Sequence, residues 1–337
     1  MHRRSFVVGT AAVVAAPMLK AQTLPAGPVR ILVGFPPGGG TDALARLLGQ
    51  KLAQMWNTNV LVENMAGAAG VTAAEYVSTQ PGDGSTLIMA HINSHALATA
   101  MGTKLKYDPI KDFTPLALVG ITPNLLVCNA DQKSKNVRQL VAECKSNPGS
   151  VSFATAGHGS AQHFALEMFN LRARISTRHV PYKGSGPALT DLISGQVNYS
   201  FDTMTAATPH VKAGRLIALA QTRTKRAASF ADVPTMVQQG FMEFDASTWY
   251  GLMAPARLPE SMARRMNEDI NRAMAMPDVK ERMDQYGAEG GGGSAQRFAR
   301  FIEQEQETWS AVAILAKIKP KPESGGRRAG AERGQHA

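Results

Sequence analysis

The stretch Gly34-Phe35-Pro36-Pro37-Gly38-Gly39-Gly40-Thr41-Asp42 joins an apolar strand, Val29–Val33, to a segment with a strongly periodic apolar face. Three consecutive glycines allow a ligand to approach the backbone and permit positive φ angles, and we expect Gly39 to be the position that a side chain would block. The unpaired N–H groups in a helix's first turn favour an anion. The stretch therefore predicts a strand, a glycine loop and a helix whose start binds a negatively charged group. The helix is predicted from apolar residues three or four positions apart, at Leu44, Leu47, Leu48, Leu52 and Met55.

Two nucleotide-binding motifs share this strand, loop and helix order, and neither fits. A P-loop ends in Gly-Lys-Ser/Thr, whereas Gly40-Thr41-Asp42 puts a carboxylate where the lysine should be. The dinucleotide fingerprint G-x-G-x-x-G lacks its third glycine. A structural turn without a ligand remains the other interpretation of the loop.

Residues 1–21 have the composition of a cleaved export signal peptide. A short basic segment, Met1–Phe6, precedes an apolar run to Leu19 that is shorter than the ~20 residues needed to span a bilayer. Arg3-Arg4 favours the twin-arginine route, although a Sec signal can carry the same pair. We expect cleavage after Ala21, a soluble mature protein and a periplasmic location.

The net charge of +10 does not indicate a nucleic-acid-binding protein once it is apportioned. The signal peptide contributes +3 and residues 317–337 contribute +4, which leaves about +3 for the folded region and no basic helix in it. Residues 317–337 are predicted to form a basic, disordered tail. With only Cys128 and Cys144 the chain is no disulfide scaffold, and two buried thiols are favoured over a single bridge.

Short apolar strands alternate with amphipathic helices along the chain, which predicts α/β layers with largely parallel sheets. Two strand segments, Pro115–Cys128 and Leu216–Thr222, are candidates to carry the chain between lobes. We therefore expect a first lobe of residues 22–120 plus 224–316 and a second lobe of residues 121–223. The other predicted strands are Val29–Val33, Val60–Val62, Leu87–Ala90, Val151–Ala154, Arg178–Val180, Tyr199–Phe201 and Trp249–Ala254.

The expected second lobe repeats the chemistry of the first loop. The segments Phe153–Ser160 and Tyr182–Ala188 each bring glycines and hydroxyls to the start of a helix, and Gly67–Gly70 is a weaker example. Each loop alone is explained equally well as an ordinary helix cap. Facing one another across a cleft, they would form a clamp for a carboxylated molecule.

Several short motifs occur in order between Pro28 and Lys319, and with them the chain resembles the Bug family of periplasmic solute receptors. That family is similar to the binding component of tripartite tricarboxylate transporters. The polar segment His91–His95 is a departure from the family pattern. The shared motifs are Phe35–Asp42, Glu63-Asn64, Pro81-x-Asp83-Gly84-x-Thr86-Leu87, Lys111–Pro115, His179–Gly184 and Trp249-x-Gly251-Leu252-x-Ala254-Pro255.

The resemblance implies a type II periplasmic-binding-protein flytrap, with a hinge between two mixed-sheet α/β lobes that close on a small carboxylate. The ligand would be a mono-, di- or tricarboxylate, an aromatic acid or an amino acid, passed to membrane transporter subunits or a sensor kinase. It implies no cofactor and no metal, and we expect a monomer. Carried over residue by residue, it assigns ligand contacts to Phe35, Pro37, Gly38, Gly39, Thr41 and Asp42 in the first lobe, and to Thr155, Gly157, Ser160, His163, Tyr182, Gly184 and Asp202 in the second.

A secreted α/β enzyme acting on a small carboxylated substrate is the alternative function. Ser160 with His158, His163 and Asp202 could form a hydrolase-like set, but the G-x-S-x-G nucleophile elbow is missing. The i, i+4 pair in His91–His95 could bind a metal on a helix, but no H-E-x-x-H pattern accompanies it. The sequence therefore favours a binding protein, with an adhesion or signalling module as a less specific third option.

Overall fold

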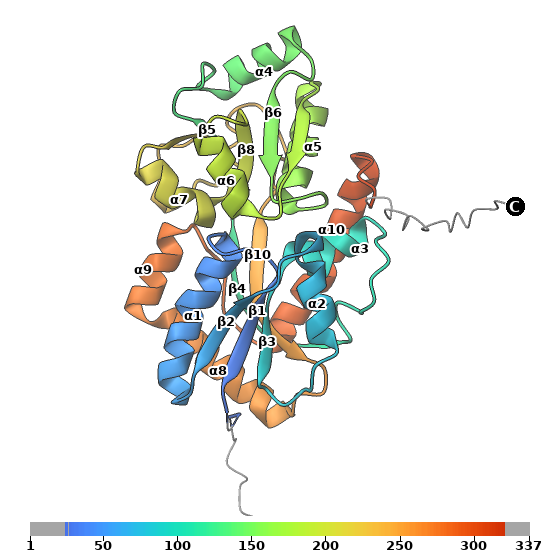
Figure 1. The fold of residues 1–337 in the computed structure, drawn as a ribbon, viewed down its shortest axis with the longest axis vertical. Helices are drawn as coiled ribbons and strands as arrows, with labels where there is room; N and C mark the ends of the chain where they lie inside the picture. The colour runs from blue at the N-terminus through green and yellow to red at the C-terminus, as the bar shows by residue number, and fades with distance from the viewer. Residues whose placement is uncertain (1–23, 26, 321–337) are drawn as a thin grey trace, which may run out of the picture.

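The computed structural model describes residues 24–25 and 27–320, and it has two lobes stacked along the long axis (Figure 1). Each lobe contains one five-stranded mixed sheet with helices on both faces. The two-lobed α/β fold expected from the sequence is confirmed. No helix of the described residues is long and apolar enough to cross a membrane. The expected signal peptide, 1–21, and residues 321–337 of the expected tail lie outside the described residues.

The sheet of the first lobe has the strand order β2-β1-β3-β10-β4. β1 pairs parallel to β2 and β3, while β10 runs antiparallel to β3 and β4. The elements of this lobe are β1 (Val29–Val33), α1 (Gly40–Trp56), β2 (Val60–Asn64), η1 (Ala68–Gly70), α2 (Val71–Ser78), β3 (Thr86–His91), η2 (Asn93–Leu97), α3 (Ala98–Ala100), β4 (Phe113–Thr122), β10 (Thr248–Pro255), α8 (Glu260–Ala275), α9 (Pro277–Gln285) and α10 (Ala295–Leu315).

The sheet of the second lobe has the order β7-β6-β8-β5-β9. β6 pairs parallel to β7 and β8, and β5 runs antiparallel to β8 and β9. Its elements are β5 (Asn124–Asn129), α4 (Val137–Ser146), β6 (Ser152–Thr155), α5 (Ala161–Ala173), β7 (Arg178–Pro181), α6 (Ser185–Ile193), β8 (Tyr199–Thr203), α7 (Met204–Lys212), β9 (Leu216–Gln221) and η3 (Ala228–Phe230).

The chain leaves the first sheet at Pro123, which divides the predicted strand Pro115–Cys128 into β4 and β5. Proline has no N–H to donate to a ladder, so it suits the break between two sheets. The return lies after β9 rather than within it, because the chain rejoins the first sheet only at Thr248. Between these points Phe244 stacks on Phe201 of the second lobe, at 6.1 Å between ring centroids. We therefore propose a second lobe that runs from residue 124 to about residue 247, past the boundary expected at Arg223.

Apolar cores lie on both faces of each sheet. In the first lobe α1, α8 and α9 pack on one face and α2 and α10 on the other, as Figure 1 shows. In the second lobe α6 and α7 cover one face and α4 and α5 the other. Cys128 and Cys144 are both free thiols buried in this second core, and burial raises the pKa of each to about 11. Because each lobe has its own apolar core, we look for a polar site at the junction between the lobes.

Candidate ligand-binding site between the lobes

A narrow pocket lies at the junction and is lined from both lobes. Its volume is about 10 Å³ in this conformation, roughly the space of one water molecule, so a larger ligand enters only when the lobes separate. None of the described residues that line it is a lysine, arginine, aspartate or glutamate. A larger hollow of about 570 Å³ lies along α8, but residues of that helix alone line it. The pocket's lining is Phe35, Gly39, Gly40, Thr41, His91 and Tyr250 from the first lobe, and Ala156, Gln162, Ser185 and Thr203 from the second.

The start of α1 forms the first-lobe wall. Its N-cap residue, Gly39, makes no side-chain cap hydrogen bond and has an extended backbone with φ −85°. The positive φ expected there belongs instead to Gly38, at +87°. A Cβ on Gly39 would meet only Ser185, at 3.8 Å, whereas a Cβ on Gly40 would lie 2.5 Å from the Tyr250 hydroxyl and 3.0 Å from Thr203 Oγ1. Gly40 is therefore the position that protein atoms close to a side chain, whereas the expectation that a side chain at Gly39 would block a ligand stays a prediction.

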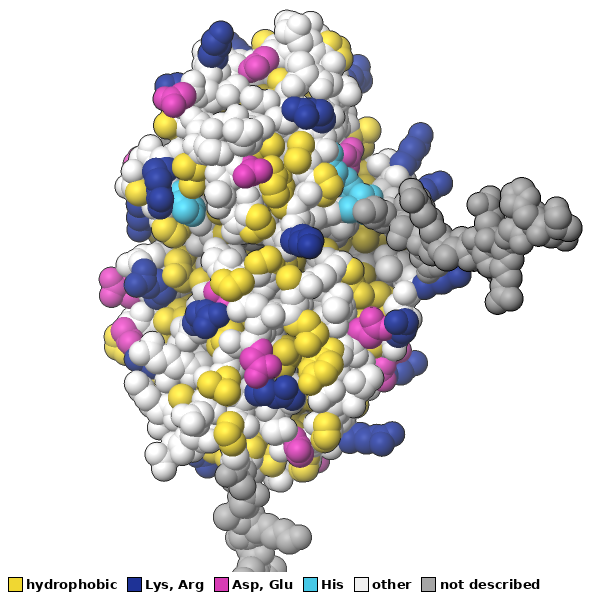
Figure 2. All heavy atoms as spheres, viewed as in Figure 1, with side chains coloured by type: hydrophobic (Ala, Val, Ile, Leu, Met, Phe, Trp, Pro, Cys, Tyr) yellow, Lys and Arg dark blue, Asp and Glu magenta, His cyan; other side chains and the backbone are white. Residues whose placement is uncertain are grey.

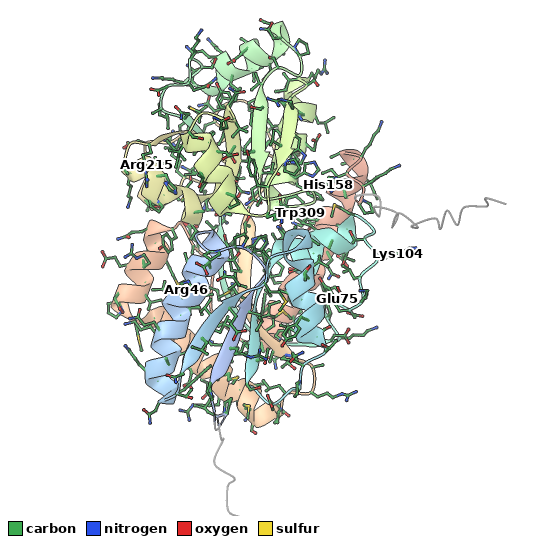
Figure 3. The ribbon with its side chains drawn as sticks, in the orientation of Figure 1. Arg46, Glu75, Lys104, His158, Arg215 and Trp309 are labelled. Atoms are coloured by element: carbon green, nitrogen blue, oxygen red, sulfur yellow. The ribbon has the colours of Figure 1, made fainter. Side chains whose placement is uncertain are left out.

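Asp42 holds the glycine loop in place. Its Oδ2 accepts from the N–H of Gly38 at 3.1 Å, and its Oδ1 accepts from Asn64 Nδ2 at 2.9 Å. Arg46 bonds both oxygens, and Asn64 also donates to the carbonyl of Phe35. Burial raises the pKa of Asp42, but the hydrogen bonds from Arg46, Asn64 and the N–H of Gly38 together outweigh it and keep the pKa below its usual value. Figure 3 shows Arg46 on α1, close to the junction. Both carboxylate oxygens are engaged with protein donors, which is the geometry of a residue that positions the loop.

His91 and Tyr250 form the back of the pocket. The His91 ring meets Phe35 and Tyr250 edge to face, with centroids 5.0 and 5.2 Å apart, and its Nδ1 accepts from the N–H of Asn93. Burial lowers the pKa of His91 to about 3, so the imidazole is neutral. The buried Tyr250 hydroxyl lies near Thr203 and Thr205 without a hydrogen bond of ordinary geometry. Burial also raises the pKa of Tyr250, so its proton stays available for donation.

Ser185 and Gln162 form the second-lobe wall, with Asp202 behind them. The Ser185 hydroxyl donates to Asp202 Oδ1 at 2.5 Å, and the N–H of Thr203 donates to the same oxygen at 2.7 Å. Asp202 is fully buried, and burial raises its pKa to about 6. Asp202 Oδ2 and Gln162 Oε1 have no hydrogen-bond partner among the described residues.

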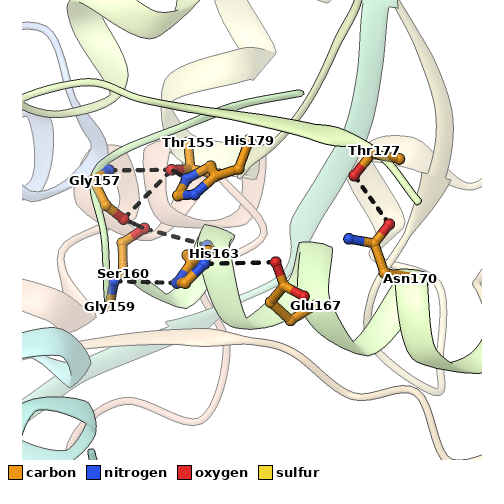
Figure 4. Close-up of polar contacts among 9 residues, drawn as sticks. All are labelled: Thr155, Gly157, Gly159, Ser160, His163, Glu167, Asn170, Thr177 and His179. Carbon is orange, nitrogen blue, oxygen red and sulfur yellow. Dashed lines mark hydrogen bonds and ion pairs between the residues drawn. The ribbon is translucent and has the colours of Figure 1, made fainter. Parts of the chain in front are cut away.

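The loop from Thr155 to Ser160 closes on itself and caps α5 (Figure 4). The Ser160 hydroxyl donates to the Gly157 carbonyl at 2.7 Å and accepts from the backbone N–H of His163. Thr155 Oγ1 lies 2.7 Å from His179 Nε2. The Thr155 and Ser160 side chains of this loop therefore bind the loop's own backbone, the helix start and His179, and Ala156 is the loop's residue in the pocket lining.

Three imidazoles stand beside that loop. The His163 ring stacks on His179 with centroids 4.3 Å apart, and His158 lies 4.8 Å from His163. Gly159 donates its N–H to His163 Nδ1, so that nitrogen carries no proton. Burial, with the neighbouring histidines, lowers the pKa of His163 to about 3. Figure 2 shows histidine side chains on this face at the level of the junction, and Figure 3 marks His158 there.

Direct contacts join the two lobes around the pocket. Asn93 in η2 accepts through Oδ1 from the N–H of Ala161, the first residue of α5, at 2.9 Å. A Cβ on Gly184 would lie 2.8 Å from Pro36 Cδ, so this loop rests against the first lobe. The Tyr182 hydroxyl donates to Asp191 in its own lobe at 2.7 Å.

The structure thus divides the residues predicted from the sequence into three groups. Phe35, Gly39 and Thr41 line the pocket. Pro37 and Gly38 are exposed beside it, and Gly184 packs against the other lobe. The remaining seven are not among the lining residues, and their polar groups bind other protein groups: Asp42, Thr155, Gly157, Ser160, His163, Tyr182 and Asp202.

Seven lining residues were not predicted. The rule that helix starts carry the site identified the right loops, but it selected Ser160 and Gly184 where Gln162 and Ser185 face the pocket. The polar segment after β3 was a usable signal for His91. Nothing in the sequence distinguished Gly40, Ala156, Thr203 or Tyr250 from their neighbours, because their placement depends on how the lobes meet.

The enzyme-like arrangements do not form in the described part of the chain. The Ser160 hydroxyl binds backbone groups rather than an imidazole. His95 packs edge to face on Phe113, and no group of three or more His, Cys, Asp or Glu among the described residues could hold a metal ion.

Comparison with known proteins identifies the family of this chain. The model of the family described as "Tripartite tricarboxylate transporter family receptor" matches residues 44–318. Protein BugT of Bordetella pertussis is 35% identical over 309 residues, which cover 91% of this chain and 94% of BugT.

Two solved structures are similar to this chain in both sequence and fold. Rpa4515 of R. palustris, solved with adipate, has a TM-score of 0.85 and 31% identity, covering 88% of this chain and 99% of its own. MatC of Rhodopseudomonas palustris, with bound malate, has a TM-score of 0.80 and 32% identity, covering 86% and 99%. The chain therefore belongs to the tripartite tricarboxylate transporter family of receptors, which includes the Bug solute-binding proteins.

Proposed function

We propose that the protein captures a small carboxylate between its lobes, outside the cytoplasm, and delivers it unchanged to the membrane subunits of a transporter or to a sensor kinase. The observation that carries this proposal is the uncapped start of α1, which faces a buried pocket at the junction of the lobes. An uncapped helix start offers N–H donors and a positive dipole end to an anion.

Buried groups around the pocket support an anionic ligand. The Tyr250 hydroxyl, Thr205 Oγ1 and Asn93 Nδ2 are donors without hydrogen-bond partners among the described residues. A buried donor without a partner costs free energy, and a carboxylate or water bound in the cleft would remove that cost. The two related structures hold adipate and malate, which are both small carboxylates.

Capture and release, rather than turnover, fits the site. No serine–histidine pair forms among the described lining residues, because Ser185 donates to the Asp202 carboxylate and the neutral His91 accepts from the N–H of Asn93. Export through the N-terminal segment, by the twin-arginine route, and action as a monomer belong to the same proposal. Neither a cofactor nor a metal is needed for it.

Mass spectrometry of small molecules released by denaturing freshly purified protein tests this function. We expect a carboxylate, and we expect that compound to raise the melting temperature when it is added back and to be recovered unchanged. At ~100 times the dissociation constant, a ligand that binds only the folded state adds about 2.7 kcal/mol. A melting temperature that responds to sugars or cations but to no carboxylate would refute the proposal, and conversion of the ligand would support the enzyme alternative.

A further inference from the structure

The two walls of the pocket have opposite hydrogen-bonding character. The first-lobe wall offers donors from the start of α1. In the second-lobe wall the Ser185 hydroxyl donates its hydrogen bond to Asp202. Toward the pocket the Ser185 oxygen can therefore only accept a hydrogen bond. Gln162, 2% exposed and part of the lining, has an unpartnered Oε1. A carboxylate alone would suit the first wall and leave the acceptors of the second without donors.

Asp202 makes the second wall negative as well. Its side chain is fully buried, and none of the ion pairs in the described part of the chain involves it. Its Oδ2 has no partner, while Oδ1 already accepts from Ser185 and Thr203. Burial raises the pKa of this carboxyl, while the hydrogen bonds from Ser185 and from the N–H of Thr203 favour its ionised form. A buried carboxylate without a cation is unfavourable, and a ligand cation beside it would offset the charge.

The two walls are close enough to hold adjacent groups of one molecule. A Cβ placed on Gly39 would lie 3.8 Å from Ser185 Cβ. A carboxylate at the start of α1 therefore places its neighbouring carbon beside Ser185.

We propose that the ligand carries a hydrogen-bond donor, an ammonium or hydroxyl group, on the carbon next to its carboxylate, and that Ser185, Gln162 and Asp202 select for that donor. This selection rests on the proposed function, because it takes the carboxylate site at α1 as given. An ammonium group both donates and neutralises Asp202, whereas a hydroxyl only donates. The expected order of affinity is thus ammonium, then hydroxyl, then the unsubstituted acid.

Calorimetry on the wild-type protein with matched acids tests the order. Aspartate, malate and succinate differ only in one group at that carbon, as do glutamate, 2-hydroxyglutarate and glutarate, and phenylalanine, 3-phenyllactate and 3-phenylpropionate. In each series that binds, we expect the ammonium member to bind about 10- to 150-fold more tightly than the unsubstituted acid. Unsubstituted acids that bind as tightly as their substituted partners would overturn the selection and leave the carboxylate function standing. Failure of every acid to bind would overturn both.

Substitutions separate the two donor classes. Asp202→Asn removes the charge at nearly constant shape, and it should lower the ratio of ammonium to unsubstituted affinity at least about tenfold, while the hydroxyl ratio changes less. Asp191→Asn, a carboxylate in the same lobe bonded to Tyr182, is the matched control and should leave both ratios unchanged. Should Asp202→Asn fail to fold, Gln162→Leu removes an acceptor at similar volume and should lower both ratios. Unchanged ratios in the folded variant would overturn the assignment of these residues.

Discussion

Helices α1 and α5 begin in the same way in the sequence and differently in the structure. Each follows a strand and a glycine-rich loop, and each has its first residues buried. In α5 the Ser160 side chain accepts from the N–H of His163, and Asn93 accepts from the N–H of Ala161. In α1 the N-cap is Gly39, which has no side chain to accept a bond. Side chains of the protein occupy the helix start of α5, whereas the start of α1 has no side-chain cap.

This difference shows that a glycine loop before a helix does not by itself identify an anion site. The decision depends on whether a side chain, near or far in the sequence, already occupies the first N–H groups. Substitutions at the start of α1 should therefore weaken ligand binding, whereas substitutions at the start of α5 should affect lobe closure or stability.

The largest effect is expected from Gly40→Ala at the start of α1. The new methyl would collide with the Tyr250 hydroxyl and with Thr203 across the junction, so the closed, binding-competent state should be lost. We expect at least about 100-fold weaker carboxylate binding by calorimetry, with far-UV circular dichroism unchanged. Gly49→Ala in the same helix is the matched control, because its methyl would meet Val60 and Val62 at an ordinary 3.5 Å. If the Gly40→Ala and Gly49→Ala variants bind the carboxylate with equal affinity, the start of α1 has no special part in binding.

An intermediate effect is expected from Asn93→Ala. This change removes the hydrogen bond that the N–H of Ala161 in the second lobe donates to Asn93 in the first lobe. That bond can form only when the two lobes are in contact. A lost neutral hydrogen bond costs about 0.5–1.5 kcal/mol, so affinity should fall roughly 2- to 13-fold. Small-angle scattering should show that the variant needs proportionally more ligand to become compact. Wild-type affinity would mean that the α5 start plays no part in closure.

Ser160→Ala should act mainly on stability. Ser160 caps α5 and bonds the Gly157 carbonyl inside its own lobe, so its loss should cost about 1–2 kcal/mol of unfolding free energy. Urea denaturation measures this cost, and Ser294→Ala at the exposed cap of α10 is the control for a cap far from the junction. Affinity in Ser160→Ala should change by less than about threefold. A loss of 10-fold or more without destabilisation would instead place Ser160 in contact with the ligand, as the sequence alone suggested.

The smallest effect on ligand affinity is expected at the imidazoles beside the α5 loop, which act instead on the pH dependence of stability. Burial depresses the pKa of His163 to about 3 and that of His179 to about 4, below the usual 6.5. The unfolded chain then binds more protons below pH 6.5, so unfolding free energy should fall as the pH drops from 6.5 toward 4. His163→Gln should flatten this fall in urea titrations by up to about 1.4 kcal/mol per pH unit. An unchanged slope would show that His163 titrates normally.

The fold could be predicted from the sequence because its signals are local. Buried strands such as Val29–Val33 are short apolar runs, and α1 has one apolar face. The site could be predicted only as far as the loops that form it. Asn93 meets the start of α5 from 68 positions away, and no periodicity links the two. Asp42 shows the same limit, because its polar character predicted a ligand contact while the structure engages it with Gly38, Arg46 and Asn64.

A crystal structure of the protein with the carboxylate that mass spectrometry identifies would show which helix start holds the ligand. We expect the carboxylate to lie at the start of α1, with its oxygens within hydrogen-bond reach, about 3 Å, of the N–H groups of Gly40 and Thr41 or one water away from them. We also expect the N–H of Ala161 to stay bound to Asn93 in the complex. A carboxylate bound at the start of α5, with Asn93 displaced, would contradict this expectation.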